Sequence, residues 1–398
     1  MLQQAFRTPL SDLSGPLVRQ ANRCGVTGTV QATETRAARS RRPHFAYNHG
    51  MSQITLVLPF ALPIPEFAPD LVRALEAPAL AALLSRTRSH ARVPVDDSIR
   101  ALPHEQWLAR ELGLSDAGRP AFAAQAMRAC GLQPEAGTWF IVNPVHIEIA
   151  RTHLMMGDPA SLRLPDTDSR ALFEAALPYV EEAGHTLVYG DAQTWFLRAA
   201  NGDNAWAGLD TATPDAALGM DLTDWMPIGE RAAAFRRLQN EVQILWHTHP
   251  VNAAREARRQ APVNAFWIWG AADAARRKSP AAPKLASFDA HGAIALLADT
   301  RFETLGDLAD FIAKAGGDTI LYCANAAPYA VGADWGGWIA QLQQLEAALF
   351  APILEALKKG RVREVKLVLS HRDAHAQFST TALAQRTFWR RPTLDRLL

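Results

Sequence analysis

Short apolar runs alternate along most of the chain with segments whose apolar positions recur every three or four residues. The apolar runs predict buried strands at residues 54–60, 139–147, 263–269, 293–298, 319–324 and 365–369. The three-and-four spacing predicts amphipathic helices at residues 168–183, 235–245 and 338–359. Residues 186–189 and 194–197 predict a hairpin around Gly190 and Asp191.

The order of these elements predicts the fold class. After residue 260, strands alternate with helices, a pattern typical of a mainly parallel, doubly wound sheet. No segment repeats, and the sequence contains no glycine-rich phosphate loop of either common pattern. We therefore expect an α/β protein without a nucleotide-binding loop of those kinds.

Composition and charge narrow the range of functions. The 398 residues are 48% apolar, and 41 basic residues face 40 acidic ones, a formal charge of +1. This balance implies no bulk attraction to nucleic acid or to a membrane, and we expect neither as a partner. No apolar run approaches the roughly 20 residues of a membrane-spanning helix. The three cysteines are far apart, so we expect lone thiols in a reducing cytoplasm.

The first fifty residues differ in character from the rest. They contain seven Arg and two acidic residues, whereas residues 51–398 contain 34 basic and 38 acidic residues. They have neither a sustained hydrophobic period nor the apolar core of a secretory signal. We expect Met51 to be the true start and residues 1–50 not to be translated; a disordered basic tail is the alternative.

Eleven Trp residues are spread along the chain. Large aromatic side chains pack in a core or between domains more often than they line a ligand groove. An exposed face of tryptophans, with an apolar patch of several hundred Å², would instead indicate a protein that acts through its surface.

The densest polar cluster follows the helix predicted at residues 235–245. Its candidate anion ligands are His249, Asn252, Arg255, Arg259 and Asn264. Arg side chains suit bidentate contact with phosphate or carboxylate groups, so this cluster predicts a site for a small anionic ligand. The alternative is a solvated helix end, where His and Arg face the negative end of the helix dipole.

The same cluster carries a resemblance to a known family. Residues 249–270 read HPVNAAREARRQAPVNAFWIWG, which is similar to a His-Pro-x-Asn…Arg…Asn…Trp-x-Trp-Gly stretch of the archaeal-type, cofactor-independent phosphoglycerate mutases. Residues 77–83 are similar to a Pro-Asn-Leu-Asp-x-Leu motif of that family. The resemblance implies an alkaline-phosphatase-like core at residues 51–137 and 262–398, with an inserted smaller α/β domain at residues 138–261.

Members of this family use two divalent ions held by Asp and His, and a Ser that carries the phosphoryl group in transit. The resemblance implies an Asp directly after the first strand, but residues 59–63 read Pro-Phe-Ala-Leu-Pro. Only His371, Asp373 and His375 could hold a metal; they alternate, so on an extended strand they would share one face. Two hard cations cannot be held without carboxylates, so we expect no cofactor.

These departures favour a catalytically degenerate phosphoglycerate-mutase-like protein. The chain resembles most a degenerate proteobacterial branch, the RpfE regulatory proteins of pathogenicity-factor gene clusters, which implies a binding or regulatory role and an unknown protein partner. The alternative is an active metal-dependent phosphomutase or phosphohydrolase that acts on phosphoglycerate-like substrates with Mn, Co or Zn. It requires Glu66, Asp70 or Asp96 to lie near the three C-terminal candidate ligands. In either case we expect a cytoplasmic protein.

Overall fold

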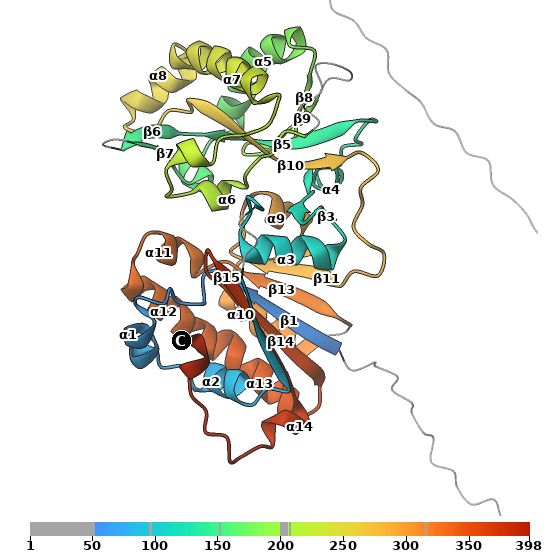
Figure 1. Ribbon diagram of the computed structural model, residues 1–398, viewed down its shortest axis with the longest axis vertical. Helices are drawn as coiled ribbons and strands as arrows, with labels where there is room; N and C mark the ends of the chain where they lie inside the picture. The colour runs from blue at the N-terminus through green and yellow to red at the C-terminus, as the bar shows by residue number, and fades with distance from the viewer. Residues whose placement is uncertain (1–51, 95–97, 151–152, 200–205, 207, 315–316) are drawn as a thin grey trace, which may run out of the picture. The chain divides into compact units, whose positions relative to one another are not determined.

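The computed structural model describes residues 52–94, 98–150, 153–199, 206, 208–314 and 317–398 (Figure 1). The leader predicted at residues 1–50 and the candidate ligand Asp96 lie outside these ranges. Residues 49–398 form one unit, whose described part is built on two sheets.

The larger sheet has seven strands, which come from separate stretches of the chain. In spatial order they are β12 (Thr300–Phe302), β11 (Lys284–Phe288), β13 (Thr319–Cys323), β1 (Ser52–Leu58), β14 (Val362–Ser370), β15 (Ala374–Thr381) and β2 (Ser89–Pro94). The first five run parallel, and β15 and β2 add an antiparallel edge. This arrangement confirms the predicted α/β class with a mainly parallel sheet.

One face of the larger sheet is covered by helices from both ends of the chain. They are α1 (Ala68–Ala74), α2 (Pro78–Ser85), α10 (Leu305–Lys314), α12 (Trp335–Leu345) and α13 (Ala351–Lys358). A π-helical turn at Glu346–Phe350 joins α12 to α13, so the long helix predicted at residues 338–359 is confirmed. The Glu346 carboxylate accepts the N–H groups of Ala79 and Leu80, which satisfies the free amide donors at the start of α2.

Three helices lie between the larger sheet and a second, antiparallel sheet (Figure 1). They are α3 (Pro103–Leu112), α4 (Ala123–Ala129) and α9 (Gly292–Leu297). The second sheet is ordered β10 (Ala265–Asp273), β5 (Thr138–Val145), β9 (Trp195–Arg198) and β8 (Thr186–Tyr189). Its other face packs on α5 (Asp166–Glu182) and α7 (Ala232–His247), with α8 (Pro250–Ala257) following α7.

The remaining described elements are short. They are the strand pairs β3 (Ser115–Asp116) with β4 (Arg119–Pro120) and β6 (Ile147–Ala150) with β7 (His153–Met156), the helices α6 (Pro214–Ala217), α11 (Ala327–Val331) and α14 (Ala382–Gln385), and the 3-10 turns Pro159–Leu162, Leu222–Asp224 and Asp395–Leu397. Within the described residues, no helix is both long and apolar enough to cross a membrane.

Two predicted elements differ from the structure. Residues 293–298 do not form a strand; they lie in helix α9, because a short apolar run alone does not distinguish a strand from a buried helix. Strand β10, predicted at residues 263–269, pairs with β5 in the second sheet. The larger sheet therefore resumes only at β11, beyond the predicted return to the core at residue 262.

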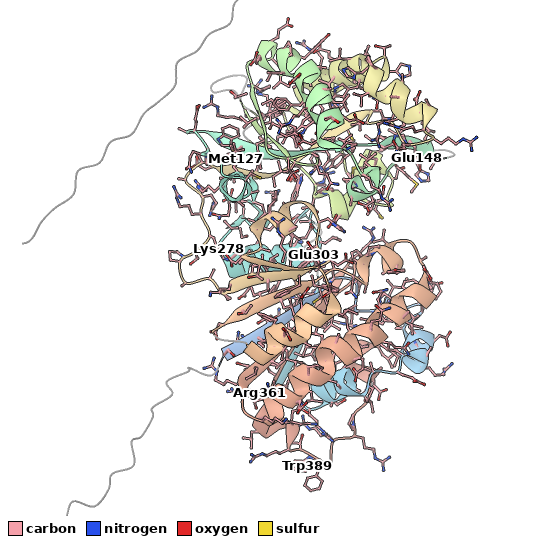
Figure 2. The ribbon with its side chains drawn as sticks, turned by 180° about the vertical axis from the view of Figure 1, so that it is seen from behind. Met127, Glu148, Lys278, Glu303, Arg361 and Trp389 are labelled. Atoms are coloured by element: carbon pink, nitrogen blue, oxygen red, sulfur yellow. The ribbon has the colours of Figure 1, made fainter. Side chains whose placement is uncertain are left out.

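Most tryptophans in the described chain pack inside it. Trp139, Trp195, Trp246, Trp267 and Trp338 are among the largest fully buried side chains. Trp389 is the exception: it is 68% exposed and projects from the surface together with Phe388 (Figure 2). The described tryptophans therefore serve mainly as core, as expected from their size.

Replacing Trp338 with Phe should lower the free energy of unfolding of the full chain by about 1–3 kcal/mol. The Trp338 indole N–H donates to the Phe60 carbonyl (2.8 Å), and the variant leaves that buried acceptor without its donor. Urea unfolding measures the difference. Trp389→Phe is the matched control and should change stability by less than about 0.5 kcal/mol, since Trp389 lies on the surface. Equal effects of the two variants would contradict the role given to Trp338.

Candidate functional site

A cleft of about 450 Å³ lies at the carboxyl ends of the parallel strands. Phe60 lines it just after β1, Tyr322 near the end of β13, and Asp289 just after β11. Asn143 of β5 and Trp269 of β10 face it from the second sheet. Ligands of doubly wound sheets bind at this edge, because the strand ends and the loops that follow them leave a crevice there.

Two of the six residues other than glycine that have positive φ in the described chain lie beside this cleft. Phe60 and Asp289 both have φ of 55°, in the left-handed region that residues with a Cβ rarely adopt. The Phe60 carbonyl accepts from Trp338, and its N–H donates to the Ser370 hydroxyl (3.4 Å), so packing holds the turn in place. Strained turns of this kind persist where the surroundings enforce them, and they are frequent at functional sites.

The floor of the cleft is formed by the first turn of α3. Pro103 occupies the first helical position, where its missing N–H costs nothing, and His104 and Glu105 follow it. Glu105 Oε2 accepts from the Leu102 N–H (2.7 Å), which caps the helix, and from the Thr213 hydroxyl (2.6 Å). Glu105 is only 1% exposed, so a carboxyl group lies buried beneath the cleft.

A second carboxyl group, Asp215, faces the same cleft from α6. Thr213 caps this helix and Pro214 begins it, which places Asp215 in its first turn. The Asp215 carboxyl group faces the cavity and is otherwise surrounded by protein. Burial raises its pKa, and the charge of Asp158 raises the pKa further, whereas His291 and Arg372 lower it. Burial also raises the pKa of Glu105, and Asp215 adds to that effect. The cleft therefore holds two carboxyl groups that resist ionisation.

His104 is held neutral beside this pair. Its Nδ1 lies 2.8 Å from the Ser370 hydroxyl, and burial, with the charge of His375, lowers its pKa to about 3. Ser370 has no exposed surface and does not line the cleft, so it is not placed to act as a nucleophile. The Ser370 hydroxyl instead orients the imidazole that faces the cavity.

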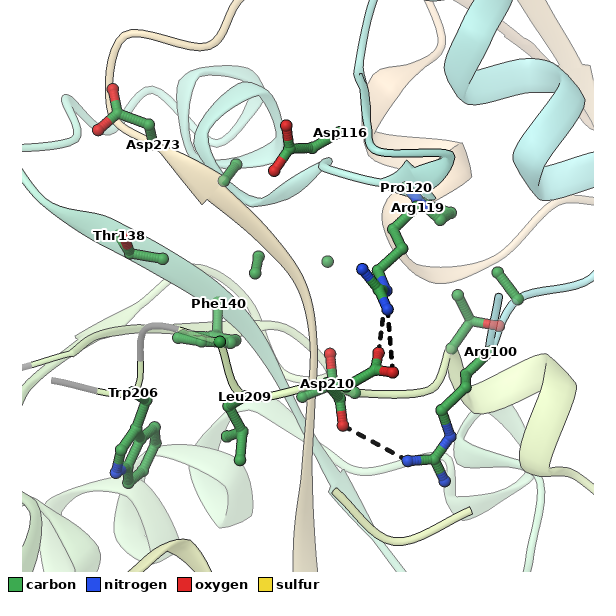
Figure 3. Close-up of a pocket in the computed structure, with 17 residues that line it drawn as sticks. Arg100, Asp116, Arg119, Pro120, Thr138, Phe140, Trp206, Leu209, Asp210 and Asp273 are labelled. Carbon is green, nitrogen blue, oxygen red and sulfur yellow. Dashed lines mark hydrogen bonds and ion pairs between the residues drawn. The ribbon is translucent and has the colours of Figure 1, made fainter. Parts of the chain in front are cut away.

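A smaller cavity of about 340 Å³ lies between the β3–β4 pair and the second sheet (Figure 3). Arg119 and Asp210 form an ion pair there at 3.0 Å. Arg100 donates to the carbonyls of Asp224 (2.7 Å) and Met226 (2.9 Å). Since these charged groups already have partners, this cavity offers less to a ligand than the cleft does.

The predicted anion ligands lie around α8, where they bond mainly to the backbone. Asn252 joins α7 to the start of β10: its side chain donates to Trp246 and Val263 carbonyls and accepts the Val263 N–H, each at 2.8 Å. Arg255 is 1% exposed and donates to the carbonyls of Ala261 and Leu162. No bound anion tests this site, which stays a prediction.

The other predicted anion ligands also lie around α8. His249 caps α8 and accepts the Val251 N–H at its Nδ1. Asn264 bonds both backbone groups of Ile147, and Arg259 is exposed in a left-handed conformation. The polar side chains of residues 249–264 therefore fasten α8 and β10 together; none of them lines the cleft.

The predicted metal ligands do not lie on one strand. β14 ends at Ser370 and β15 begins at Ala374, so His371 and Asp373 lie in the turn of a hairpin. The prediction of a shared face on an extended segment is therefore wrong, because the chain reverses there. His371 Nδ1 accepts the Asp373 N–H, and the Asp373 side chain is 88% exposed, 3.9 Å from that ring. His375 Nε2 bonds to Gln377.

These residues do not fit the two-metal centre that the resemblance implies. In the part of the chain that the structure describes, no three His, Cys, Asp or Glu side chains come together to hold a metal ion. Asp70, offered as a substitute ligand, pairs with Arg73 on the surface of α1. Glu66 is exposed and does not line the cleft. The described residues therefore contain no assembled ligand set for metal-dependent phosphoryl transfer.

Sequence reasoning missed the residues that form the cleft. Asp215 lies about a hundred positions after Glu105, Tyr322 about a hundred positions after Asp215, and the three belong to no shared motif. The available signals were local: a Pro followed by an acidic residue at two helix starts, Pro103 to Glu105 and Pro214 to Asp215. Those signals predict where each helix starts. They do not predict that both helices start beside the same cavity.

Comparison with known proteins supports the resemblance over part of the chain. A stretch of 140 residues is 26% identical to a probable 2,3-bisphosphoglycerate-independent phosphoglycerate mutase of Geobacter sulfurreducens. Over this stretch the chain is similar to a phosphoglycerate mutase. The match covers 35% of this chain and 34% of the relative, so this chain spans about a third of the relative's length. No family model matches the sequence.

One solved structure supports the fold. The PH0037 protein of Pyrococcus horikoshii superposes with a TM-score of 0.52 at 12% identity, over 87% of this chain and 92% of its own. The cofactor-independent phosphoglycerate mutase of Thermoplasma acidophilum gives a TM-score of 0.39 at 14% identity, over 83% and 90% of the two chains. The PH0037 protein therefore shares the architecture over most of this chain.

Replacing Asn252 with Ala should lower the free energy of unfolding by about 2–4 kcal/mol, because three buried backbone groups lose their partners. Urea unfolding checks this. Arg259→Ala should change stability by less than about 0.5 kcal/mol, as an exposed control. If Asn252→Ala is as stable as the unmodified chain, the hydrogen bonds of the Asn252 side chain do not stabilise this region.

Glu105→Gln and Asp215→Asn should gain stability relative to the unmodified chain as pH rises. In the folded chain both carboxyl pKa values are raised above the ordinary values of about 4, so folding retains protons and stability falls as pH rises from there. The amides keep hydrogen-bond acceptors and remove the titration. Urea unfolding from about pH 4 to about pH 8 measures the difference; a difference that is constant with pH would contradict the raised pKa values.

Proposed function

We propose that this phosphoglycerate-mutase-like chain is catalytically degenerate and acts by binding, in a regulatory role like that of the RpfE proteins. It binds a ligand in the cleft at the carboxyl ends of the parallel strands and acts in the cytoplasm. Phosphoryl transfer is not part of this role.

One observation carries the proposal. The family mechanism needs two cations to neutralise charge on the transferred phosphoryl group. After β1 the chain offers Pro59 and Phe60, after β13 it offers Ala324 and Asn325, and after β14 it offers Ser370 and His371. No three potential ligands converge among the described residues. The absence of carboxylates directly after β1, β13 and β14 supports a chain that has lost the metal centre.

The cleft itself supports binding as the remaining role. It keeps a volume within the range of small-molecule sites, about 300–1,000 Å³. Its floor contains buried polar side chains, among them His104, Glu105 and Asn143. Carboxyl groups that are buried there lose the hydration that stabilises their charged form. A bound partner offsets that loss.

The full chain should retain no divalent metal and show no turnover. After loading with excess manganese and desalting, bound metal per chain should be near zero, since no complete ligand set is present. The same sample should neither interconvert phosphoglycerates nor hydrolyse a phosphate monoester with manganese, cobalt or zinc. Metal analysis and a coupled enzymatic assay measure the two quantities.

An active metal-dependent phosphomutase or phosphohydrolase is the alternative that this experiment separates. It predicts one or two ions per chain and turnover that is lost in His371→Ala, because His371 is one of its candidate ligands. Leu383→Ala is a surface control that should change neither quantity. Turnover that depends on His371 would overturn the proposal of a degenerate enzyme.

A further inference from the structure

The charge of the cleft limits which ligand it can take. Its lining carboxyl groups are Glu105, Glu148, Asp158, Asp215 and Asp289. No Lys or Arg in the described chain lines it. The nearby Arg372 guanidinium donates to the carbonyls of Ala216 and Leu218 and is therefore already bonded. A phosphorylated acid entering this cleft would meet five carboxyl side chains, with His104 and His291 as the only basic side chains in the described lining.

Two buried polar side chains present unbonded atoms to this cavity. Tyr322 is 3% exposed and lines the cleft, and its hydroxyl forms no hydrogen bond with any residue that the structure describes. Both hydrogen bonds of Glu105 end on Oε2, so its Oε1 has none within the same ranges. Neither atom is among the described side-chain atoms that are sealed from solvent without a partner, so both are accessible from the cavity, where a ligand or water can meet them.

Apolar and aromatic groups complete the lining. Phe60 and Trp269 contribute rings, and Met156 and Ile294 contribute aliphatic surface. The Trp269 indole N–H donates to Asn143 Oδ1 (2.6 Å), which fixes that ring. Aromatic faces attract cations, because their quadrupole is negative above the ring.

We propose that the cleft binds a small organic cation, an ammonium or guanidinium group on a partly apolar body, with its charge between Glu105 and Asp215 and an N–H directed to the Tyr322 hydroxyl. The inference rests on the proposed function, since it names the ligand class of that same site. A cation there also offsets the burial that raises the pKa of both carboxyl groups. Binding therefore releases protons near neutral pH and tightens as pH rises.

Calorimetric titration of the full chain with choline, putrescine and agmatine tests the proposal, with 3-phosphoglycerate as the anionic comparison. At least one amine should bind, and 3-phosphoglycerate should not. Asp215→Asn should weaken amine binding about tenfold or more, because one of the two charges is lost. Tyr322→Phe should weaken it about fivefold through one hydrogen bond. Asp395→Asn makes the same chemical change on an exposed C-terminal turn and should leave binding unchanged.

The outcomes separate this inference from the proposed function. Amine binding that is insensitive to both Asp215→Asn and Tyr322→Phe overturns the inference, and so does a failure of all three amines to bind. Binding of 3-phosphoglycerate without turnover also overturns it, while leaving a non-catalytic binding protein. Turnover of 3-phosphoglycerate overturns the proposed function itself.

Discussion

The buried carboxyl group of Glu105 is the constraint on which the site depends. Its Oε2 accepts from the start of α3 and from Thr213, the cap of α6, and so it joins a helix packed on the larger sheet to a segment beside the second sheet. Because Glu105 is almost inaccessible to solvent, its charge has little water to stabilise it. The position of α6, and with it Asp215, follows from this one bond network, and so does the preference of the cleft for a positive partner.

The same region forms a crevice without the metal-binding acid that the resemblance implies after the first strand. Strand ends around a switch point leave a crevice whatever side chains occupy it. Here the turn after β1 is held by Trp338 and Ser370, with Phe60 strained, where the resemblance implies a metal-binding acid. The carboxyl groups present enter instead from α3 and α6. A cavity with acids but no assembled ligand set favours a cation over a phosphorylated anion.

Much of the fold could be predicted from the sequence, because period and element order are local. The strands at residues 54–60 and 319–324, the hairpin near Gly190 and the helix at residues 168–183 all form near their predicted positions. The site was far less predictable. His371, Asp373 and His375 would share one face only on an extended segment, and no signal in the sequence marks the chain reversal that follows β14. Glu105 comes near Asp215 only through tertiary folding. Of residues 249–270, which carry the resemblance, Asn252 fastens α8 to the chain just before β10, and Trp269 alone lines the cleft.

Anomalous scattering from a crystal of the full chain, grown with manganese, 3-phosphoglycerate and a bound amine from the titration, tests the central claim most directly. Data collected above the manganese absorption edge locate any bound ion without reference to activity. We predict no anomalous peak at the ends of β1, β13 and β14, and density for the amine beside Glu105 and Asp215. A manganese peak at those strand ends, with 3-phosphoglycerate bound to it, would contradict the account.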